Sequence, residues 1–330
     1  MSTDARAFWV VEPGRGEIRG AALPAPGAGE VRVRALHSGI SRGTETLVFR
    51  GAVPADQYAA MQAPHQEGDF PAPVKYGYLS VGVVEEGPPA LVGRTVFCLH
   101  PHQTGYVVPV EAVTVVPDEV PVRRAVLAGT VETAVNAVWD APPLIGDRVA
   151  VVGAGMVGCC VARLLSRVPG VAVTLVDVDP TRVEVAGRLG VGFALPEELQ
   201  GGSAGGLGGH DLVVHTSATG DGLQLSLDLL ADEGTVLELS WYGDSRVELA
   251  LGGSFHSRRL GIRASQVGSV AAVRRSRYTH AQRLALAVDL LRDPAFDSLL
   301  TGESAFEELP AVLPQLVAGT LPAICHTIAY

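Results

Sequence analysis

The chain has 330 residues, of which 47% are hydrophobic and 18% are charged, and its formal net charge is -10 at pH 7. This length suits two domains rather than one small core, and the apolar content excludes long disorder. The acidic balance argues against nucleic acid as a partner, because proteins that bind phosphate backbones display basic surface. No run approaches the roughly 20 apolar residues of a membrane span, and the N-terminus lacks a basic region followed by an apolar segment. We therefore expect a cytoplasmic protein without nucleic-acid or membrane partners.

The first third of the chain has the texture of a β-domain. Residues 1–116 alternate short β-branched runs with Gly and Pro, as in GEVRVRALHSG and SVGVVEEGPP. This rhythm predicts a small, mostly antiparallel barrel with substantial loops. From about residue 121 the texture changes to PVRRAVLAGTVETAVNAVWDA, whose apolar positions recur at helical spacing. A second domain is expected to begin near this point.

The next segments alternate between strand and helix signals. A strand and Gly turn, DRVAVVGAG, is followed by the helix MVGCCVARLLSRV, the strand VAVTLVDVD, the helix PTRVEVAGRLG and the strand DLVVHTSA. This order predicts parallel βαβ units and an α/β, doubly wound parallel sheet. The glycine-rich residues 200–211 are expected to form a flexible surface connection. After about residue 265 helices return, and the chain finishes on the strand-like AICHTIAY.

The first strand of this alternation ends in a G-x-G-x-x-G motif made of Gly153, Gly155 and Gly158. A lone motif is weak evidence, but here an apolar strand precedes it and a helix follows it. We expect Gly153 to permit a tight turn, Gly155 to let the backbone approach a pyrophosphate, and Gly158 to pack helix against strand. The helix start, with Met156 and Val157, would then face the anionic phosphates.

Asp177 closes the following strand and supports a dinucleotide as the ligand. Its carboxylate is expected to accept hydrogen bonds from both hydroxyls of the adenosine ribose. Because Asp177 would repel a 2′-phosphate, NAD is favoured over NADP; Arg182 is the counter-argument, since an arginine near this strand end can pair with that phosphate. Ser217, after a later strand, is a further expected cofactor contact.

The ordered set of segments resembles the medium-chain dehydrogenase/reductase superfamily. SGISRGTE resembles the family's GICGTD loop, PVKYGYLSVGVVEEG its P-x-x-x-G-H-E segment, LAGTVETAVNAV its domain-linking helix and GDRVAVVGAGMVG its cofactor turn. The resemblance implies a GroES-like β-barrel catalytic domain at residues 1–133 and 265–330, a Rossmann domain at residues 134–264, and a homodimer by family analogy. The loop is most similar to that of the bacteriochlorophyllide a dehydrogenase branch, but this likeness does not identify the substrate.

The departures from the family pattern concern its zinc ligands. Ser41 stands where the family has a cysteine ligand, and Tyr78 stands where it has a histidine ligand. Glu132 remains at a position where some relatives place a third ligand. A serine, a phenol and one carboxylate make a poor zinc site, and the four cysteines form no C-x-x-C pair. We therefore expect no zinc, although His100 and His102 could in principle recruit a metal with Glu132.

Without zinc, side chains must stabilise the charge on the reacting oxygen and handle its proton. The candidates, from positions that line the family's cleft, are Ser41, Thr44, Glu45, Tyr78, His100 and Glu132. Tyr78 can place a phenol near that oxygen, but its usual pKa of about 10 would have to fall for it to act as a base. His100 titrates near neutrality if unperturbed. Glu132 and Asn136 share a helix face, and the analogy makes Asn136 a partner of the cofactor's ribose or carboxamide.

Three functions remain open at this point. The leading hypothesis is a zinc-independent, NAD-linked enzyme that interconverts a secondary alcohol and a ketone on a polar metabolite. The first alternative is a quinone or enoyl reductase acting on a C=C bond, a group that commonly prefers NADPH. The second is a dinucleotide-binding sensor or partner protein without turnover.

Overall fold

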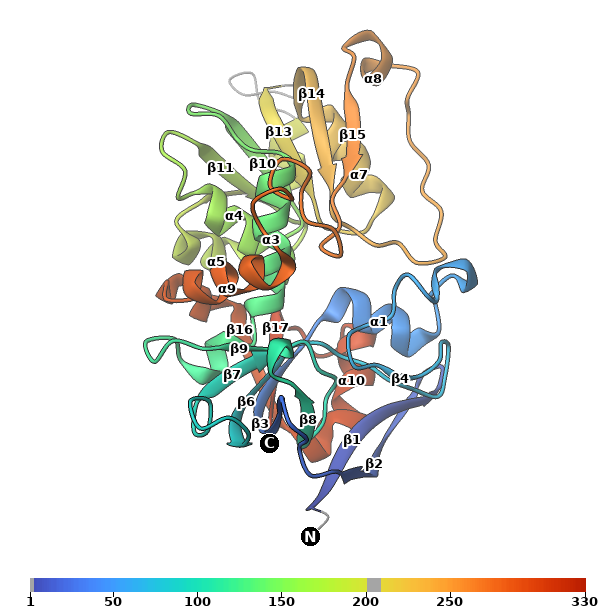
Figure 1. Cartoon of the computed structure of the whole chain (residues 1–330). Coiled ribbons are helices and arrows are strands. Elements are labelled where there is room, and N and C mark those ends of the chain that lie inside the picture. Colours follow the sequence, from blue (N-terminus) through green and yellow to red (C-terminus); the bar gives the residue numbers. More distant parts are fainter. Residues whose placement is uncertain (1–2, 201–208) are drawn as a thin grey trace. The chain divides into compact units, whose positions relative to one another are not determined.

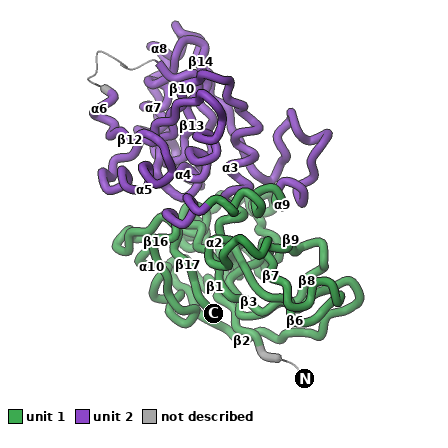
Figure 2. Tube along the Cα trace, turned by 90° about the vertical axis from the view of Figure 1, so that its left-hand side faces the viewer, with its two compact units in different colours: residues 1–129, 284–293, 300–330 green, residues 130–283, 294–299 purple. Residues whose placement is uncertain are grey.

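The computed structural model describes residues 3–200 and 209–330, so most of the glycine-rich connection expected at residues 200–211 lies outside the described residues. The chain divides into two compact units (Figure 2). Unit 1 comprises residues 1–129, 284–293 and 300–330, and unit 2 comprises residues 130–283 and 294–299. Among the described residues, no helix is both long and apolar enough to cross a membrane.

Unit 1 is built on two largely antiparallel sheets (Figure 1). The smaller sheet has the order β2-β1-β5-β4 and the larger one the order β16-β17-β3-β6-β7-β9, with β8 also paired to β3. Its strands are β1 (Thr3–Glu12), β2 (Arg15–Leu23), β3 (Glu30–Ile40), β4 (Glu67–Gly68), β5 (Val74–Lys75), β6 (Ser80–Glu86), β7 (Thr95–Cys98), β8 (Gly105–Pro109), β9 (Val113–Val115), β16 (Leu300–Ala305) and β17 (Cys325–Ala329).

The central strand of unit 1 shows why the sequence folds in this way. Along β3 the apolar Val31, Val33 and Ala35 alternate with charged residues, and all three are buried. A period of two places them on one face of the strand, where Val31 and Val33 pack with Val84 and Val96. The helices of this unit are α1 (Arg42–Arg50), α2 (Val122–Ala125) and α10 (Leu309–Ala318).

Unit 2 contains a six-stranded parallel sheet with the order β12-β11-β10-β13-β14-β15. The chain starts in the middle, moves to one edge, and returns to build the other half, which is the doubly wound Rossmann arrangement. The fold class expected from the sequence is therefore confirmed. The strands are β10 (Arg148–Val152), β11 (Ala172–Val176), β12 (Gly192–Ala194), β13 (His210–His215), β14 (Leu230–Glu238) and β15 (Gly261–Ala264).

Helices follow the strands of unit 2 in the expected alternation. The shared helices α3 and α9 each contain a boundary between the units. The helices are α3 (Ala128–Asp140), α4 (Met156–Leu165), α5 (Arg182–Leu189), α6 (Pro196–Gln200), α7 (Gly220–Asp228), α8 (Ser254–Ser257) and α9 (His280–Leu290).

The compact units differ from the domain bounds expected from the sequence. Residues 265–283 belong to unit 2, whereas a return to the first domain was expected from residue 265. The physical reason lies in contacts to α3: Ser265 Oγ donates to Asp140 Oδ2 at 2.7 Å, and Arg283 is paired with Glu132. These bonds hold the segment after β15 to the helix that begins unit 2.

Candidate functional site

Two clusters of polar side chains, one in each unit, contain most of the residues expected to act. In unit 1, Tyr78 lies between β5 and β6, and Ser41 directly precedes α1. The Tyr78 hydroxyl donates to Ser41 Oγ at 2.6 Å, and the Ser41 backbone N–H donates to Glu45 Oε1 at 2.7 Å. The structure thus brings together three of the candidate residues.

The Tyr78 phenol is held in its protonated form near neutral pH. Burial raises the pKa of Tyr78 to about 12, although its hydrogen bonds with Ser41 and Thr44 oppose the rise, and Glu45 adds to it. The phenol is therefore a proton donor rather than a base at neutrality. The Lys75 ammonium donates to Glu67 and to Gln103 Oε1, and it is not among the groups that shift this pKa.

Glu45 is also the first member of a buried row of hydrogen-bonded side chains that the sequence did not predict. Its Oε2 accepts from His102 Nε2 at 2.9 Å, and His102 Nδ1 contacts Ser38 Oγ at 2.7 Å. Ser38 Oγ also contacts the Tyr330 hydroxyl at 2.9 Å. Glu45, His102 and Ser38 are all at least 95% buried. We refer to these three residues as the Glu45–His102–Ser38 row.

Local backbone geometry makes room for this row. Gly77 has φ +126°, a conformation that favours glycine. A side chain at Gly77 would also come within 3.0 Å of the His102 ring. Glycine just before Tyr78 therefore lets the imidazole pack against the backbone of the loop that carries the phenol.

His100 differs from the expectation of an imidazole that titrates near neutrality. It is buried, its Nδ1 donates to the Pro101 carbonyl at 2.9 Å, and its ring stacks on Tyr106 with centroids 3.8 Å apart. Burial lowers the pKa of His100 well below its usual value. The ring is neutral at physiological pH and packs against Tyr106, and its expected catalytic role stays a prediction.

The polar groups of Glu132 and Asn136 are hydrogen-bonded to other residues of unit 2. Arg283 Nε donates to Glu132 Oε1 at 3.1 Å, and Arg283 Nη1 donates to Asn136 Oδ1 at 2.5 Å. The Asn136 amide also accepts from Ala271 N at 3.0 Å. Burial raises the pKa of Glu132 against the opposing effect of Arg283. These contacts join α3 to the segment after β15, and the expected roles of the two residues as base and cofactor ligand stay predictions.

The glycine turn has the geometry that its sequence predicts. Gly153 adopts φ +110°, and a side chain at Gly158 would lie 1.9 Å from the Gly153 carbonyl oxygen. Packing within the protein therefore requires both glycines. A side chain at Gly155, which directly precedes α4, would meet no protein atom within 4 Å. That opening lies directly before the helix start, whereas the Met156 side chain is buried, and contact of Met156 and Val157 with a ligand stays a prediction.

Asp177 is tied to the same turn. Its Oδ2 accepts from Ala154 N at 2.6 Å, and its Oδ1 accepts from Asp179 N at 2.9 Å. Arg182 Nε lies 3.2 Å from Asp179 Oδ2, so its charge is partly used within the protein. The carboxylate thus lies beside the turn, and its contact with a ribose stays a prediction.

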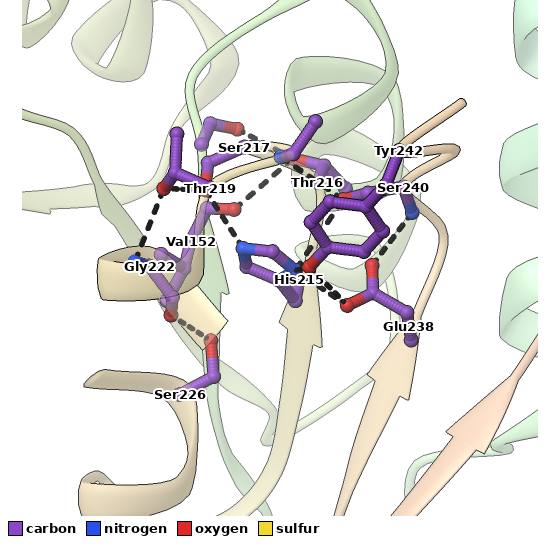
Figure 3. Close-up of polar contacts among 12 residues, drawn as sticks. Val152, His215, Thr216, Ser217, Thr219, Gly222, Ser226, Glu238, Ser240 and Tyr242 are labelled. Carbon is purple, nitrogen blue, oxygen red and sulfur yellow. Dashed lines mark hydrogen bonds and ion pairs between the residues drawn. The ribbon is translucent and has the colours of Figure 1, made fainter. Parts of the chain in front are cut away.

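A second row of polar residues stands at the carboxyl ends of β13 and β14 (Figure 3). His215 Nδ1 donates to Glu238 Oε2 at 2.7 Å, and His215 Nε2 contacts Ser217 Oγ at 2.7 Å. Tyr242 and Thr219 bond to the two ends of this row. Sequence reasoning had selected only Ser217. We call it the Glu238–His215–Ser217 row.

The residues at the family's zinc positions do not fit a zinc ion. Ser41 and Tyr78 are hydrogen-bonded to each other, and Glu132 is ion-paired with Arg283. Within residues 3–200 and 209–330, no group of three or more His, Cys, Asp or Glu side chains could hold a metal ion. Zinc in proteins favours imidazole and thiolate ligands, which this set does not supply.

Comparison with known proteins gives distant sequence relatives and close structural ones. No family model matches the chain. The chain is similar to D-guloside 3-dehydrogenase of Escherichia coli K12 and of Shigella flexneri, with 28% identity over 232 residues in each case. The match covers 63% of this chain and 66% of the relative, slightly less than two thirds of the relative's length.

Solved structures match the chain over nearly its full length. L-idonate 5-dehydrogenase from Escherichia coli K-12 superposes with a TM-score of 0.80 at 14% identity, covering 100% of this chain and 99% of that one. 2R,3R-butanediol dehydrogenase from Bacillus subtilis gives a TM-score of 0.77 at 16% identity, covering 99% of each chain. At such low identity these matches establish the shared fold of both units.

Proposed function

We propose that this chain, which has the fold of the medium-chain dehydrogenase/reductase superfamily and is a distant homologue of its members, is an NAD(P)-dependent dehydrogenase that interconverts a secondary alcohol and a ketone on a polar, sugar-like metabolite. The names of D-guloside 3-dehydrogenase and L-idonate 5-dehydrogenase describe dehydrogenases of sugar derivatives. They favour oxidation of an alcohol over reduction of a C=C bond.

The dinucleotide is assigned to the glycine turn of unit 2. The open position at Gly155 and the start of α4 suit a pyrophosphate. Asp177, beside the turn, suits the ribose hydroxyls of NAD and disfavours the 2′-phosphate of NADP. When bound, the reduced nicotinamide supplies the hydride.

The hydrogen bond between Tyr78 and Ser41 carries the proposal for the substrate oxygen. With its pKa raised to about 12, Tyr78 keeps its proton near neutral pH and can give it to the oxygen of a ketone during reduction. Ser41 holds the phenol in place and provides a second hydroxyl. Thr44 supports the phenol, and Glu45 fixes the Ser41 backbone. This arrangement replaces the role that zinc has in the family, so the enzyme works without the metal.

The test compares Tyr78→Phe with Tyr76→Phe, a matched loss of a phenol hydroxyl two residues away. Both proteins are assayed with NADH and NADPH against polyol-derived ketones and enones. Tyr78→Phe should lower kcat by about 100-fold to 10,000-fold with little change in NADH affinity, whereas Tyr76→Phe should change kcat little. Equal effects of the two substitutions would refute the role of Tyr78.

The panel also separates the alternative functions. Reduction of enones but not ketones, with a preference for NADPH, would indicate a C=C reductase. Tight NADH binding without turnover of any compound would favour a sensor or partner protein. Either outcome contradicts the alcohol dehydrogenase proposal.

A further inference from the structure

The Glu238–His215–Ser217 row lies directly beside the glycine turn of unit 2. His215 is the last residue of β13 and pairs in register with Val152, the last residue of β10. A side chain at Gly153 would come within 2.8 Å of the Ser217 backbone nitrogen. A dinucleotide on this turn therefore meets the edge where Ser217 lies, at the point where the strand order of the sheet reverses.

The acid end of the row is a carboxylate surrounded by donors. Glu238 accepts from His215 Nδ1 at 2.7 Å, from the Tyr242 hydroxyl at 3.0 Å and from Ser240 N at 2.6 Å. Burial alone would raise the pKa of Glu238, but the bonds from His215 and Ser240 outweigh it and lower that pKa. Because the ionised carboxylate only accepts, the proton on His215 Nδ1 is fixed toward Glu238.

The other ring nitrogen then determines what Ser217 can do. When the ring carries only the Nδ1 proton, Nε2 is an acceptor and the Ser217 hydroxyl, 2.7 Å away, donates to it. Thr219 Oγ1 accepts from Gly222 N at 3.1 Å, which leaves its hydrogen free to point at Ser217 Oγ, 2.9 Å away. Ser217 Oγ has two lone pairs, and these contacts use only one.

Packing keeps this arrangement in place from the side of α7. A side chain at Gly222 would come within 2.2 Å of Ser217 Oγ and 2.9 Å of His215 Nε2. His215 is fully buried, whereas Ser217 is only partly buried. The row therefore starts in the interior and ends at a hydroxyl that a ligand can reach.

We propose that His215 is a positioning residue for the dinucleotide: held by Glu238, it orients the Ser217 hydroxyl so that the remaining lone pair of Ser217 Oγ accepts a hydrogen bond from a ribose hydroxyl. This inference rests on the proposed function, since it requires NAD(P) at the glycine turn. It assigns a role to His215 and Glu238, which contact the ligand only through Ser217.

The experiment is a double-mutant cycle on the full chain with NADH as the probe. The variants are His215→Gln, Ser217→Ala and the double substitution, with dissociation constants measured by NADH fluorescence and folding followed by Tm. Ser217→Ala should weaken NADH binding about fivefold, the effect of one hydrogen bond. His215→Gln should weaken it to a similar degree, and the double variant should bind no more weakly than Ser217→Ala. A purely structural His215 would instead give additive losses.

Two further variants serve as a control and as a replacement in this test. His210→Gln changes a buried histidine on the same strand, whose ring Nδ1 donates to the Leu229 carbonyl, and should leave NADH affinity unchanged. If His215→Gln fails to fold, Glu238→Gln replaces it, and it should weaken NADH binding in the natural background but not beside Ser217→Ala.

The outcomes separate this inference from the proposed function. A natural chain that binds neither NADH nor NADPH contradicts the proposed function itself. A natural chain that binds NADH, with unchanged affinity in the Ser217 and His215 variants or with additive losses, overturns only the role of His215.

Discussion

Each unit contains a carboxylate, an imidazole and a hydroxyl in a hydrogen-bonded row: Glu45, His102 and Ser38 in unit 1, and Glu238, His215 and Ser217 in unit 2. The two rows differ in which ring nitrogen bonds the carboxylate. The unit 1 carboxylate bonds Nε2, and the unit 2 carboxylate bonds Nδ1.

The rows also differ in where the serine lies. Ser38 is fully buried and its hydroxyl has a second partner in Tyr330. Ser217 is partly buried and ends at the carboxyl edge of a Rossmann sheet. In unit 1 the enclosed hydroxyl lets the row stabilise the fold. In unit 2 the accessible hydroxyl leaves the same three residue types available to a ligand.

The largest effect is expected from a substitution that breaks the enclosed Glu45–His102–Ser38 row. Glu45→Ala leaves buried His102 and the Ser41 N–H without their acceptor, so the free energy of unfolding should fall by about 3–5 kcal/mol. Urea denaturation measures it. The control, Glu307→Ala, removes an exposed ion pair with Arg6 and should cost at most about 1 kcal/mol. Similar losses in both variants would show that the enclosed row contributes little.

The second prediction concerns the turn beside the accessible row. Gly158→Ala places a side chain 1.9 Å from a backbone oxygen, so it should destabilise the fold by about 1–3 kcal/mol and abolish NADH binding. Gly155→Ala meets open space and should weaken NADH binding while leaving the free energy of unfolding nearly unchanged. Chemical denaturation and NADH titration of both variants check this contrast, and loss of stability in Gly155→Ala would contradict it.

The third prediction compares the two serines directly. Ser38→Ala leaves His102 Nδ1 without its partner and removes one hydrogen bond of the Tyr330 hydroxyl, which keeps the one with the Gln103 backbone, and should cost about 1–2 kcal/mol of unfolding free energy. Ser217→Ala should change stability less and NADH affinity more. The comparison fails if Ser217→Ala is the more destabilising substitution.

The smallest effect is on the pH dependence of stability. The pKa of Glu238 is lowered in the folded state, so its contribution is present above the ordinary value of 4.5 and is lost as the pH falls through the folded pKa. Glu132 has a raised pKa, so its contribution is present below 4.5 and is lost as the pH rises through the folded pKa. The free energy of unfolding is measured between pH 7 and pH 3 for the natural chain and for each variant. The loss of this free energy should therefore grow with rising pH for Glu238→Gln and shrink with rising pH for Glu132→Gln. Slopes of the same sign would contradict these assignments.

Local patterns in the sequence predict the fold and the glycine turn well. The alternation of strands and helices after residue 148 leads to the Rossmann sheet, and the spacing of Gly153 and Gly158 reflects packing inside a single turn. The pairing of Ser41 with Tyr78 follows from the family resemblance, which had set both at the same site.

The hydrogen-bond partners of these residues are not predictable in this way. His102 meets Glu45 across 57 residues, and Arg283 meets Glu132 across 151. Such contacts depend on strand register and on the path of the chain, which periodicity does not encode. Glu238 was missed for the same reason, since it reaches His215 only because β13 and β14 are adjacent.

The central claim is that Tyr78 and Ser41, without zinc, serve an NAD(P)-dependent dehydrogenase. The most direct measurement is the zinc content and the turnover of one purified sample, before and after treatment with a chelator. We predict ketone reduction with NADH, zinc far below one ion per chain, and a rate that the chelator leaves unchanged. One tightly bound zinc per chain, with activity lost on its removal, would contradict this account.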